Sequence, residues 1–183
     1  MKKFKKLVAL ILVGVMAMAM LTACGGGGGG SKSFATEVED AVFSVYSQAF
    51  GVKTNDAEAK KLAQTALGYV KDGKFYRTDL LNHCMTKDEA KKQIMFAMPI
   101  PAEDAEENDN YYTVMEITPE MLAELKATNI PAEDIGEIRD MINELETAGA
   151  KMTGLGVAAK TINGKTYVAF GIKMEIDINK LPQ

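Results

Sequence analysis

The chain has 183 residues and a formal net charge of −4, and charged residues make up 25% of it. This length suits one small domain or at most two, and the composition is that of an ordinary soluble globular protein. Two cysteines are too few for a disulfide-rich scaffold or a multi-cysteine zinc site, and one histidine excludes metal sites built on several histidine ligands. The informative features therefore lie in particular segments.

The N-terminal segment has the form of an export signal. Four lysines stand at positions 2, 3, 5 and 6, and an unbroken apolar run of 15 residues follows from Leu7 to Leu21. That run is shorter than the roughly 20 residues that a membrane-spanning helix needs. A basic start, a short apolar run and small residues after it are typical of a signal peptide.

The end of this segment, Leu21-Thr22-Ala23-Cys24, resembles the lipobox of bacterial lipoproteins. The resemblance covers residues 1–24 only, and the alternative is an ordinary secretory signal followed by a chance cysteine. The resemblance implies that residues 1–23 are a cleaved signal peptide and that Cys24 carries a thioether-linked lipid with acyl chains such as palmitate. Two acyl chains suffice for stable anchoring, so we expect the protein on the extracytoplasmic face of the cell membrane.

A glycine-rich tether follows the cysteine. Residues 25–30 are all glycine, and residues 24–33 together have no capacity to fold. Such a segment reaches roughly 16 Å on average and about 30 Å when stretched. Polyglycine at this position is similar to lipoproteins of Gram-positive anaerobes, which implies the Gram-positive cell surface.

Removing residues 1–23 removes four lysines and no acid, so the net charge moves from −4 to −8. The domain without this segment is therefore acidic. Because affinity for nucleic acid depends on positive side chains that neutralise phosphates, we expect no nucleic-acid partner.

Residues 34–183 are predicted to form a single globular α+β domain, beginning with two helices. Apolar residues recur at helical spacing from Phe34 to Phe50, and Gly51 then ends the helix. Asn55, with Glu58 three residues later, is predicted to cap a second helix that ends before Asp72-Gly73.

Three further helices and one strand are predicted in the middle of the chain. Thr86-x-x-Glu89 has the form of a capping box for a helix that Pro99 ends. The segment 111–117 is rich in strand-forming residues. A short helix is predicted to begin at Thr118-Pro119, and another runs from Pro131 to Gly149.

The C-terminal segment predicts a β-hairpin, because Asn163-Gly164 stands between two extended runs. A two-residue loop pairs Ala159 with Val168, Val157 with Phe170 and Leu155 with Ile172, which places six apolar side chains on one face. The predicted fold is a small antiparallel sheet, formed by this hairpin and one strand near 111–117, that is covered on one face by amphipathic helices.

The opposite face of the hairpin pairs Gly156 with Gly171 and Ala158 with Ala169, beside Tyr167. Glycine within a strand usually marks a close approach by another segment of the chain, and that is the reading we expect. The alternative is that a partner or ligand docks there, with Tyr167, Ala169 and Gly171 as its candidate binding residues.

Few residues are candidates for catalysis or metal binding. His83 and Cys84 are adjacent, and neighbours in a helix or strand point apart, so we expect a buried thiol rather than a catalytic dyad. The acidic stretch 103–109 lacks the glycine and the spacing of an EF-hand, so we expect a solvated loop. No nucleotide-binding, hydrolase or zinc-protease motif occurs.

These observations favour a membrane-anchored, non-enzymatic binding or envelope-accessory module, without catalytic residues, metal or cofactor, that binds membrane lipid through Cys24 and an unidentified protein or small ligand. The alternative is a small extracytoplasmic hydrolase or thiol enzyme that uses Cys84 and His83.

Overall fold

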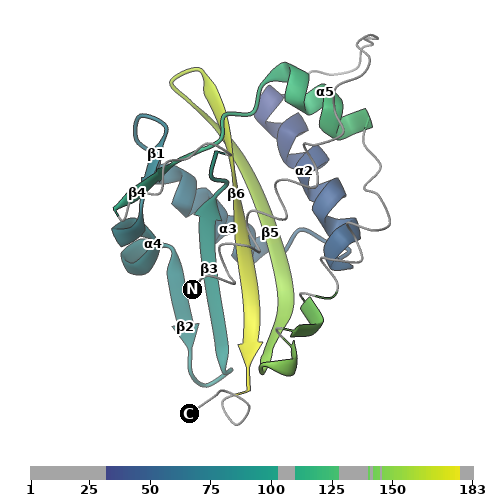
Figure 1. Ribbon diagram of the computed structural model, residues 1–183, viewed down its shortest axis with the longest axis vertical. Coiled ribbons are helices and arrows are strands. Elements are labelled where there is room, and N and C mark those ends of the chain that lie inside the picture. Colours follow the sequence, from purple (N-terminus) through teal and green to yellow (C-terminus); the bar gives the residue numbers. More distant parts are fainter. Residues whose placement is uncertain (1–31, 103–109, 128–139, 141, 145, 178–183) are drawn as a thin grey trace.

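The computed structural model describes residues 32–102, 110–127, 140, 142–144 and 146–177. Helices and strands alternate irregularly along the chain in an α+β fold, as predicted (Figure 1). In chain order the elements are α2 (Phe34–Phe50), α3 (Ala57–Gly68), β1 (Lys74–Tyr76), α4 (Arg77–His83), β2 (Met85–Asp88), β3 (Gln93–Pro99), β4 (Tyr111–Thr113), α5 (Pro119–Ala127), β5 (Ala150–Ile162) and β6 (Lys165–Ile176).

The first helix has the predicted bounds. The Ser33 side chain accepts a hydrogen bond from the Thr36 backbone N–H, and Gly51 ends α2 in a left-handed conformation with φ of 68°. A serine cap and a left-handed glycine satisfy backbone groups that the helix itself leaves unpaired.

The second helix begins one residue later than predicted, because Asp56 rather than Asn55 is its cap. The Asp56 carboxylate accepts hydrogen bonds from the backbone N–H groups of Glu58 and Ala59. A carboxylate also interacts favourably with the positive end of the helix dipole. Asn55 instead bonds to the backbone of Val157 in β5.

The prediction of a helix from Thr86 to Met98 is wrong, because this segment forms the antiparallel pair β2–β3. The Asp88 carboxylate accepts a hydrogen bond from the Lys91 backbone, and Lys92 turns with φ of 52°. An apolar run of this length is ambiguous between strand and buried helix. Pairing of β3 with both β2 and β6 decides the outcome.

The hairpin prediction is confirmed, with Ala159 opposite Val168, Val157 opposite Phe170 and Leu155 opposite Ile172. Asn163 and Gly164 both have positive φ, as the mirror-image two-residue turn requires. A register shift between Met152 and Gly154 then displaces the far end of the pairing. The hairpin forms one side of a four-stranded antiparallel sheet in the order β2-β3-β6-β5.

The strand predicted near 111–117 exists only as β4, which pairs with β1 in a separate two-stranded sheet. Beyond it the chain runs beside the start of β6, where the Ile117 N–H donates to the Thr166 carbonyl. Helix α5 then begins at Pro119, as predicted, and the Thr118 hydroxyl accepts a hydrogen bond from Met121 N–H.

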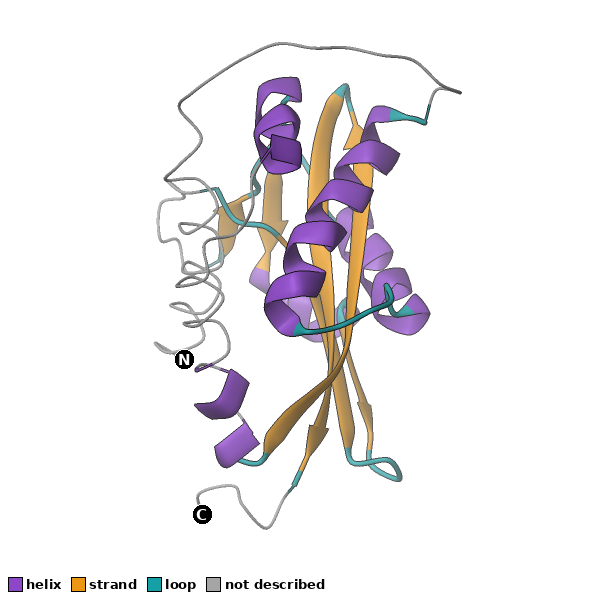
Figure 2. Cartoon of the chain, turned by 90° about the vertical axis from the view of Figure 1, so that its right-hand side faces the viewer, coloured by secondary structure: helices purple, strands orange, loops and turns teal. Residues whose placement is uncertain are grey.

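Helices pack on both faces of the main sheet, whereas the sequence predicted helices on one face only. The α2 core contains α2, Leu122 of α5 and the predicted apolar face of the hairpin. The α3 core contains α3, Phe75, Ala97 and the small residues of the opposite face. Figure 2 shows α2 lying across the strands, which continue beyond α2 and α3 at the far end of the sheet.

Several predictions fall outside the described residues: the signal peptide 1–23, most of the tether 24–33, the acidic stretch 103–109 and the start of the helix at Pro131. The end of that last helix is described. Residues 142–144 and 146–147 are helical, and Gly149 has φ of 88°, which agrees with the predicted end.

Candidate functional site

The face of the hairpin that carries Tyr167, Ala169 and Gly171 is covered by α3. Tyr167 is 4% exposed, and Ala169 has no exposed surface. A Cβ atom built on Gly171 would lie 2.0 Å from the Ala59 carbonyl oxygen, and one on Gly156 would lie 2.0 Å from the Lys60 nitrogen. These three candidate binding residues are therefore interior residues, which corrects the alternative of a docking surface and agrees with close packing within the chain.

The glycines of this face determine where the first turn of α3 can sit. Gly156 and Gly171 admit the backbone of residues 59 and 60, and Gly154 admits the Asp56 carboxylate, which would lie 2.9 Å from a Cβ atom there. Glycine weakens a strand, and here it allows a helix backbone to approach the sheet without side chains between them.

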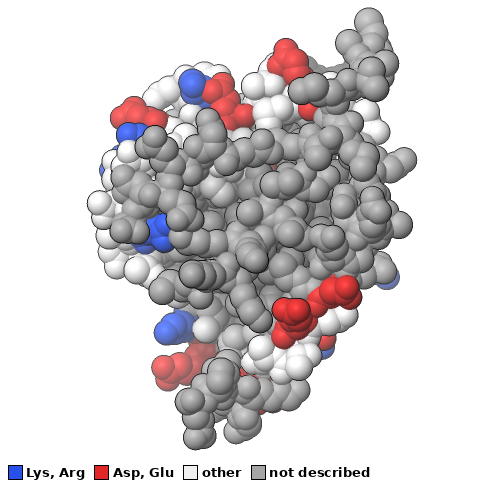
Figure 3. All heavy atoms as spheres, in the orientation of Figure 1, with Lys and Arg blue, Asp and Glu red and all other residues white. Residues whose placement is uncertain are grey.

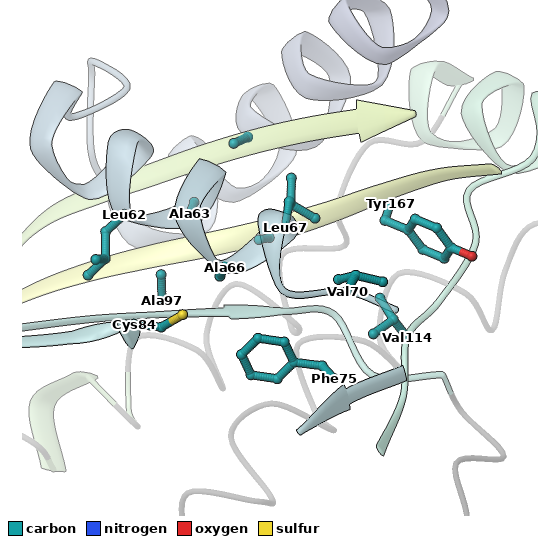
Figure 4. Close-up of a cluster of buried hydrophobic side chains, with 12 residues drawn as sticks. Leu62, Ala63, Ala66, Leu67, Val70, Phe75, Cys84, Ala97, Val114 and Tyr167 are labelled. Atoms are coloured by element: carbon teal, nitrogen blue, oxygen red, sulfur yellow. The ribbon is translucent and has the colours of Figure 1, made fainter. Parts of the chain in front are cut away.

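Cys84 lies inside the α3 core with no exposed surface. Figure 4 shows it beside Ala97, and the Ala97 N–H donates to the Cys84 carbonyl oxygen. Burial raises the pKa of the Cys84 thiol to about 11, and the negative charge of Asp79 contributes to the same shift. Such a thiol carries little thiolate, which is the reactive form, at neutral pH.

The neighbouring His83 is exposed and stacks on Tyr69, with ring centroids 4.6 Å apart and planes 5° from parallel. Cys84 points into the core while His83 lies at the surface, so the structure does not bring them together as a dyad. Among the described residues, no group of three or more His, Cys, Asp and Glu side chains is placed to hold a metal ion.

A groove that the sequence did not predict lies between α3 and the β2 edge of the sheet. It has a volume of about 470 Å³. Helix α3 supplies one wall, with Glu58, Lys61, Leu62 and Thr65. The strands and the β2–β3 turn supply the rest, with Thr86, Lys87, Asp88, Lys91, Gln93, Met95 and Lys173. We call this site the α3–β2 groove.

Sheet register explains why the groove exists. Ala97 is paired with Gly171 under the first turn of α3, and the next row on the same face contains Thr86, Met95 and Lys173. Thr86, Met95 and Lys173 line the groove, so this part of the sheet is not closed over by α3. The sequence did not predict the groove, because the capping box Thr86-x-x-Glu89 predicts a helix in this segment instead of the strand β2.

The lining of the α3–β2 groove carries four lysines and two acids. Both acids are already paired, Glu58 with Lys173 and Asp88 with Lys91. The hydrogen bond to Glu58 raises the pKa of Lys173, with the nearby Asp56 charge adding to the effect. Within the part of the chain that the structure describes, Lys61 and Lys87 have no acidic partner. Lys87 is paired with Ile94, so its side chain belongs to the face of β2 opposite to Thr86, and Lys61 is the unpaired cation on the α3 side of the groove.

A second hollow, of about 910 Å³, lies at the far end of the sheet around Gly149 and Asp177. Its described lining has three lysines matched by three acids (Lys91, Lys92, Lys151, Glu146, Glu175 and Asp177), so it favours neither sign of charge. On the face shown in Figure 3, acidic and basic side chains of the described residues are likewise interspersed. The α3–β2 groove is therefore the stronger candidate site for a charged ligand.

None of the described helices combines the length and apolar character needed to cross a membrane. Comparison of the chain with known protein families, with curated proteins and with solved structures gave no match.

Proposed function

We propose that this protein is an extracytoplasmic lipoprotein, anchored in the cell membrane by a lipid on Cys24, whose domain is a non-enzymatic binding module. The observation that carries the anchor is the order of four features in the sequence: a basic start, a short apolar run, Leu21-Thr22-Ala23 and then Cys24. Each feature is common alone, but together they match what lipid attachment to a cysteine requires.

The start of the folded domain is compatible with this arrangement. Ser33 caps α2, so regular structure begins directly after the glycine-rich segment. A tether of this length would hold the domain within about 30 Å of the membrane surface. A binding module placed there would meet ligands at the cell surface.

The geometry around Cys84 favours a binding module over the alternative of a thiol enzyme. A nucleophilic thiol needs access to its substrate and a base within hydrogen-bond reach. Cys84 is buried among apolar side chains of the α3 core, and the ring of His83 stacks on Tyr69 at the surface. The α3–β2 groove offers, in contrast, an accessible place for a ligand beside the unpaired Lys61.

Incorporation of a labelled fatty acid in the producing cell tests the anchor. The two cysteines allow a matched comparison between Cys24→Ala and Cys84→Ala, which make the same chemical change. We expect the unmodified protein and Cys84→Ala to incorporate label, and Cys24→Ala to incorporate none, because only Cys24 would form the thioether. Label in Cys24→Ala equal to that in Cys84→Ala, or none in the unmodified protein, would refute the proposal.

A further inference from the structure

The described helices leave part of the main sheet uncovered on the side where α2 packs. Helix α2 packs on β5 and β6, whereas β2 and β3 contact α3 and α4, which pack together around the α3 core. Strands lie about 4.8 Å apart and a helix is about 10 Å across, so one helix covers about two strands. The strand register places on the uncovered part four apolar side chains that belong to neither described core, and we call them the methionine strip: Met85, Ile94, Met98 and Met174.

The chain between α5 and β5 has both of its ends on this side of the sheet. The Lys126 ammonium pairs with the Glu37 carboxylate at 2.5 Å, which holds the end of α5 beside α2. Figure 2 shows the helical turns before β5 at the far end of the sheet, on the opposite side of the strands from α3. Ala159 bonds to Glu39 of α2 and β5 begins at Ala150, so the two ends are about nine strand residues, or roughly 30 Å, apart.

The connecting segment has the length and the pattern to cross this distance as one helix. A helix over residues 131–148 would be about 27 Å long. Four apolar residues recur in it at helical spacing: Ile135, Ile138, Ile142 and Leu145. At the described end of the segment, Ile142 is half-buried, whereas the described residues around it are exposed: Asp140, Asn143, Glu144 and Glu146. The apolar stripe therefore belongs to the side of the helix that faces the protein.

The charges of the segment and of the sheet are complementary. Residues 131–148 contain six acids and one arginine. Lys87 is paired with Ile94, so its side chain lies on the same side of the sheet as the methionine strip. Among the described residues Lys87 has no acidic partner. An acidic amphipathic helix thus fits an apolar strip that has a free cation at its edge.

We propose that residues 131–148 form an amphipathic helix that packs Ile135, Ile138, Ile142 and Leu145 on the methionine strip, beside α2. Most of this helix lies outside the described residues. The two helices together cover the width of the sheet, and flexible methionine side chains adapt readily to branched isoleucines. The contact concerns the folded domain alone and is independent of the lipid anchor.

Chemical cross-linking tests the contact in residues 24–183 carrying Cys24→Ala and Cys84→Ala, a chain that contains every described element. In this background we expect a short bismaleimide to join the two cysteines of Ile138→Cys/Met174→Cys within one chain, as read by mass spectrometry of the digested monomer. The matched control is Asp140→Cys/Met174→Cys. Asp140 is exposed and is two residues, or about 200°, further around the helix, so this pair should give little intrachain product.

The same experiment distinguishes other occupants of the methionine strip. Equal intrachain yields from the two cysteine pairs, or no intrachain product from either, would overturn the proposal. Cross-links that form only between chains would assign the strip to a second copy of the protein, and they would overturn it as well.

The melting temperature gives a second readout that needs no added cysteine. Ile138→Ala should lower it by roughly 6 °C or more, as expected when a buried isoleucine is truncated in a domain of this size. Asp140→Ala, on the opposite side of the helix, should change it by no more than about 2 °C. Equal melting temperatures for these two variants would contradict the packing of the stripe.

Discussion

Cys84 illustrates how burial controls the chemistry of one side chain. Apolar surroundings disfavour the thiolate, and the nearby Asp79 charge adds to this, so the thiol pKa rises from an ordinary 9.0 to about 11. A thiol with a pKa near 11 carries very little thiolate at neutral pH, and the thiolate is the form that reacts.

We therefore expect a soluble thiol reagent to label Cys84 at pH 8 at least about a hundredfold more slowly in the native protein than in denaturant. Because the pKa is raised, the native rate should still increase between pH 9 and 11, where the rate in denaturant has levelled off. The protein carrying Cys24→Ala removes any contribution from the other cysteine. Native labelling as fast as in denaturant would contradict the burial and strengthen the thiol-enzyme alternative.

Gly171 limits the distance between α3 and the sheet. A Cβ atom there would meet the Ala59 backbone at 2.0 Å, and backbone in a helix cannot move aside as a flexible side chain can. We expect Gly171→Ala to lower the free energy of unfolding by at least about 3 kcal/mol, the upper end of the usual range for overpacking.

The control is Gly68→Ala at the end of α3, where a Cβ atom meets nothing within 4 Å. Alanine is a better helix former, so this variant should be neutral or more stable by up to about 1 kcal/mol. Thermal and chemical unfolding measure both. Similar stability of the two variants would mean that α3 does not pack closely on the glycine face.

At the scale of the elements, the outer edge of β5 is protected by groups from outside the sheet. The Asn55 side chain donates to the Val157 carbonyl at 3.0 Å and accepts from the Val157 N–H at 2.8 Å. On either side of Val157, the Leu155 carbonyl oxygen accepts a hydrogen bond from the Asp56 N–H, and the Ala159 N–H donates to the Glu39 carboxylate. An edge strand with unpaired backbone groups is a site for unwanted pairing with other chains.

Asn55→Ala should lower the free energy of unfolding by about 1–3 kcal/mol, because it leaves both Val157 backbone groups without their partner. The neighbouring exposed Thr54 gives a control, since Thr54→Ala should change stability by no more than about 0.5 kcal/mol. Equal effects in denaturant unfolding would show that the Asn55 bonds do not contribute to stability.

For the whole molecule, local signals predicted the hairpin register, α2 and α5, because each of these depends on turn or cap residues nearby in the sequence. The β2–β3 pair was predicted as a helix, since what makes Gln93–Pro99 a strand is pairing with β6, whose partner residues lie 70 to 82 positions later. Paired glycines correctly predicted close packing on the second face of the hairpin, but not that α3 fills it.

The α3–β2 groove could not be predicted from the sequence, for the same physical reason. Its residues come from one helix, three strands and the β2–β3 turn, and they meet only because the glycines fix the position of α3 over the sheet. The groove therefore depends on tertiary packing that no local pattern records.

Mass spectrometry of the protein extracted from membranes tests the central proposal, the lipid anchor, most directly. We expect the mature chain to begin at Cys24, with an N-terminal peptide whose mass includes a diacylglyceryl group on that residue. A mature chain that begins at another residue, or an N-terminal Cys24 without lipid, would contradict the account.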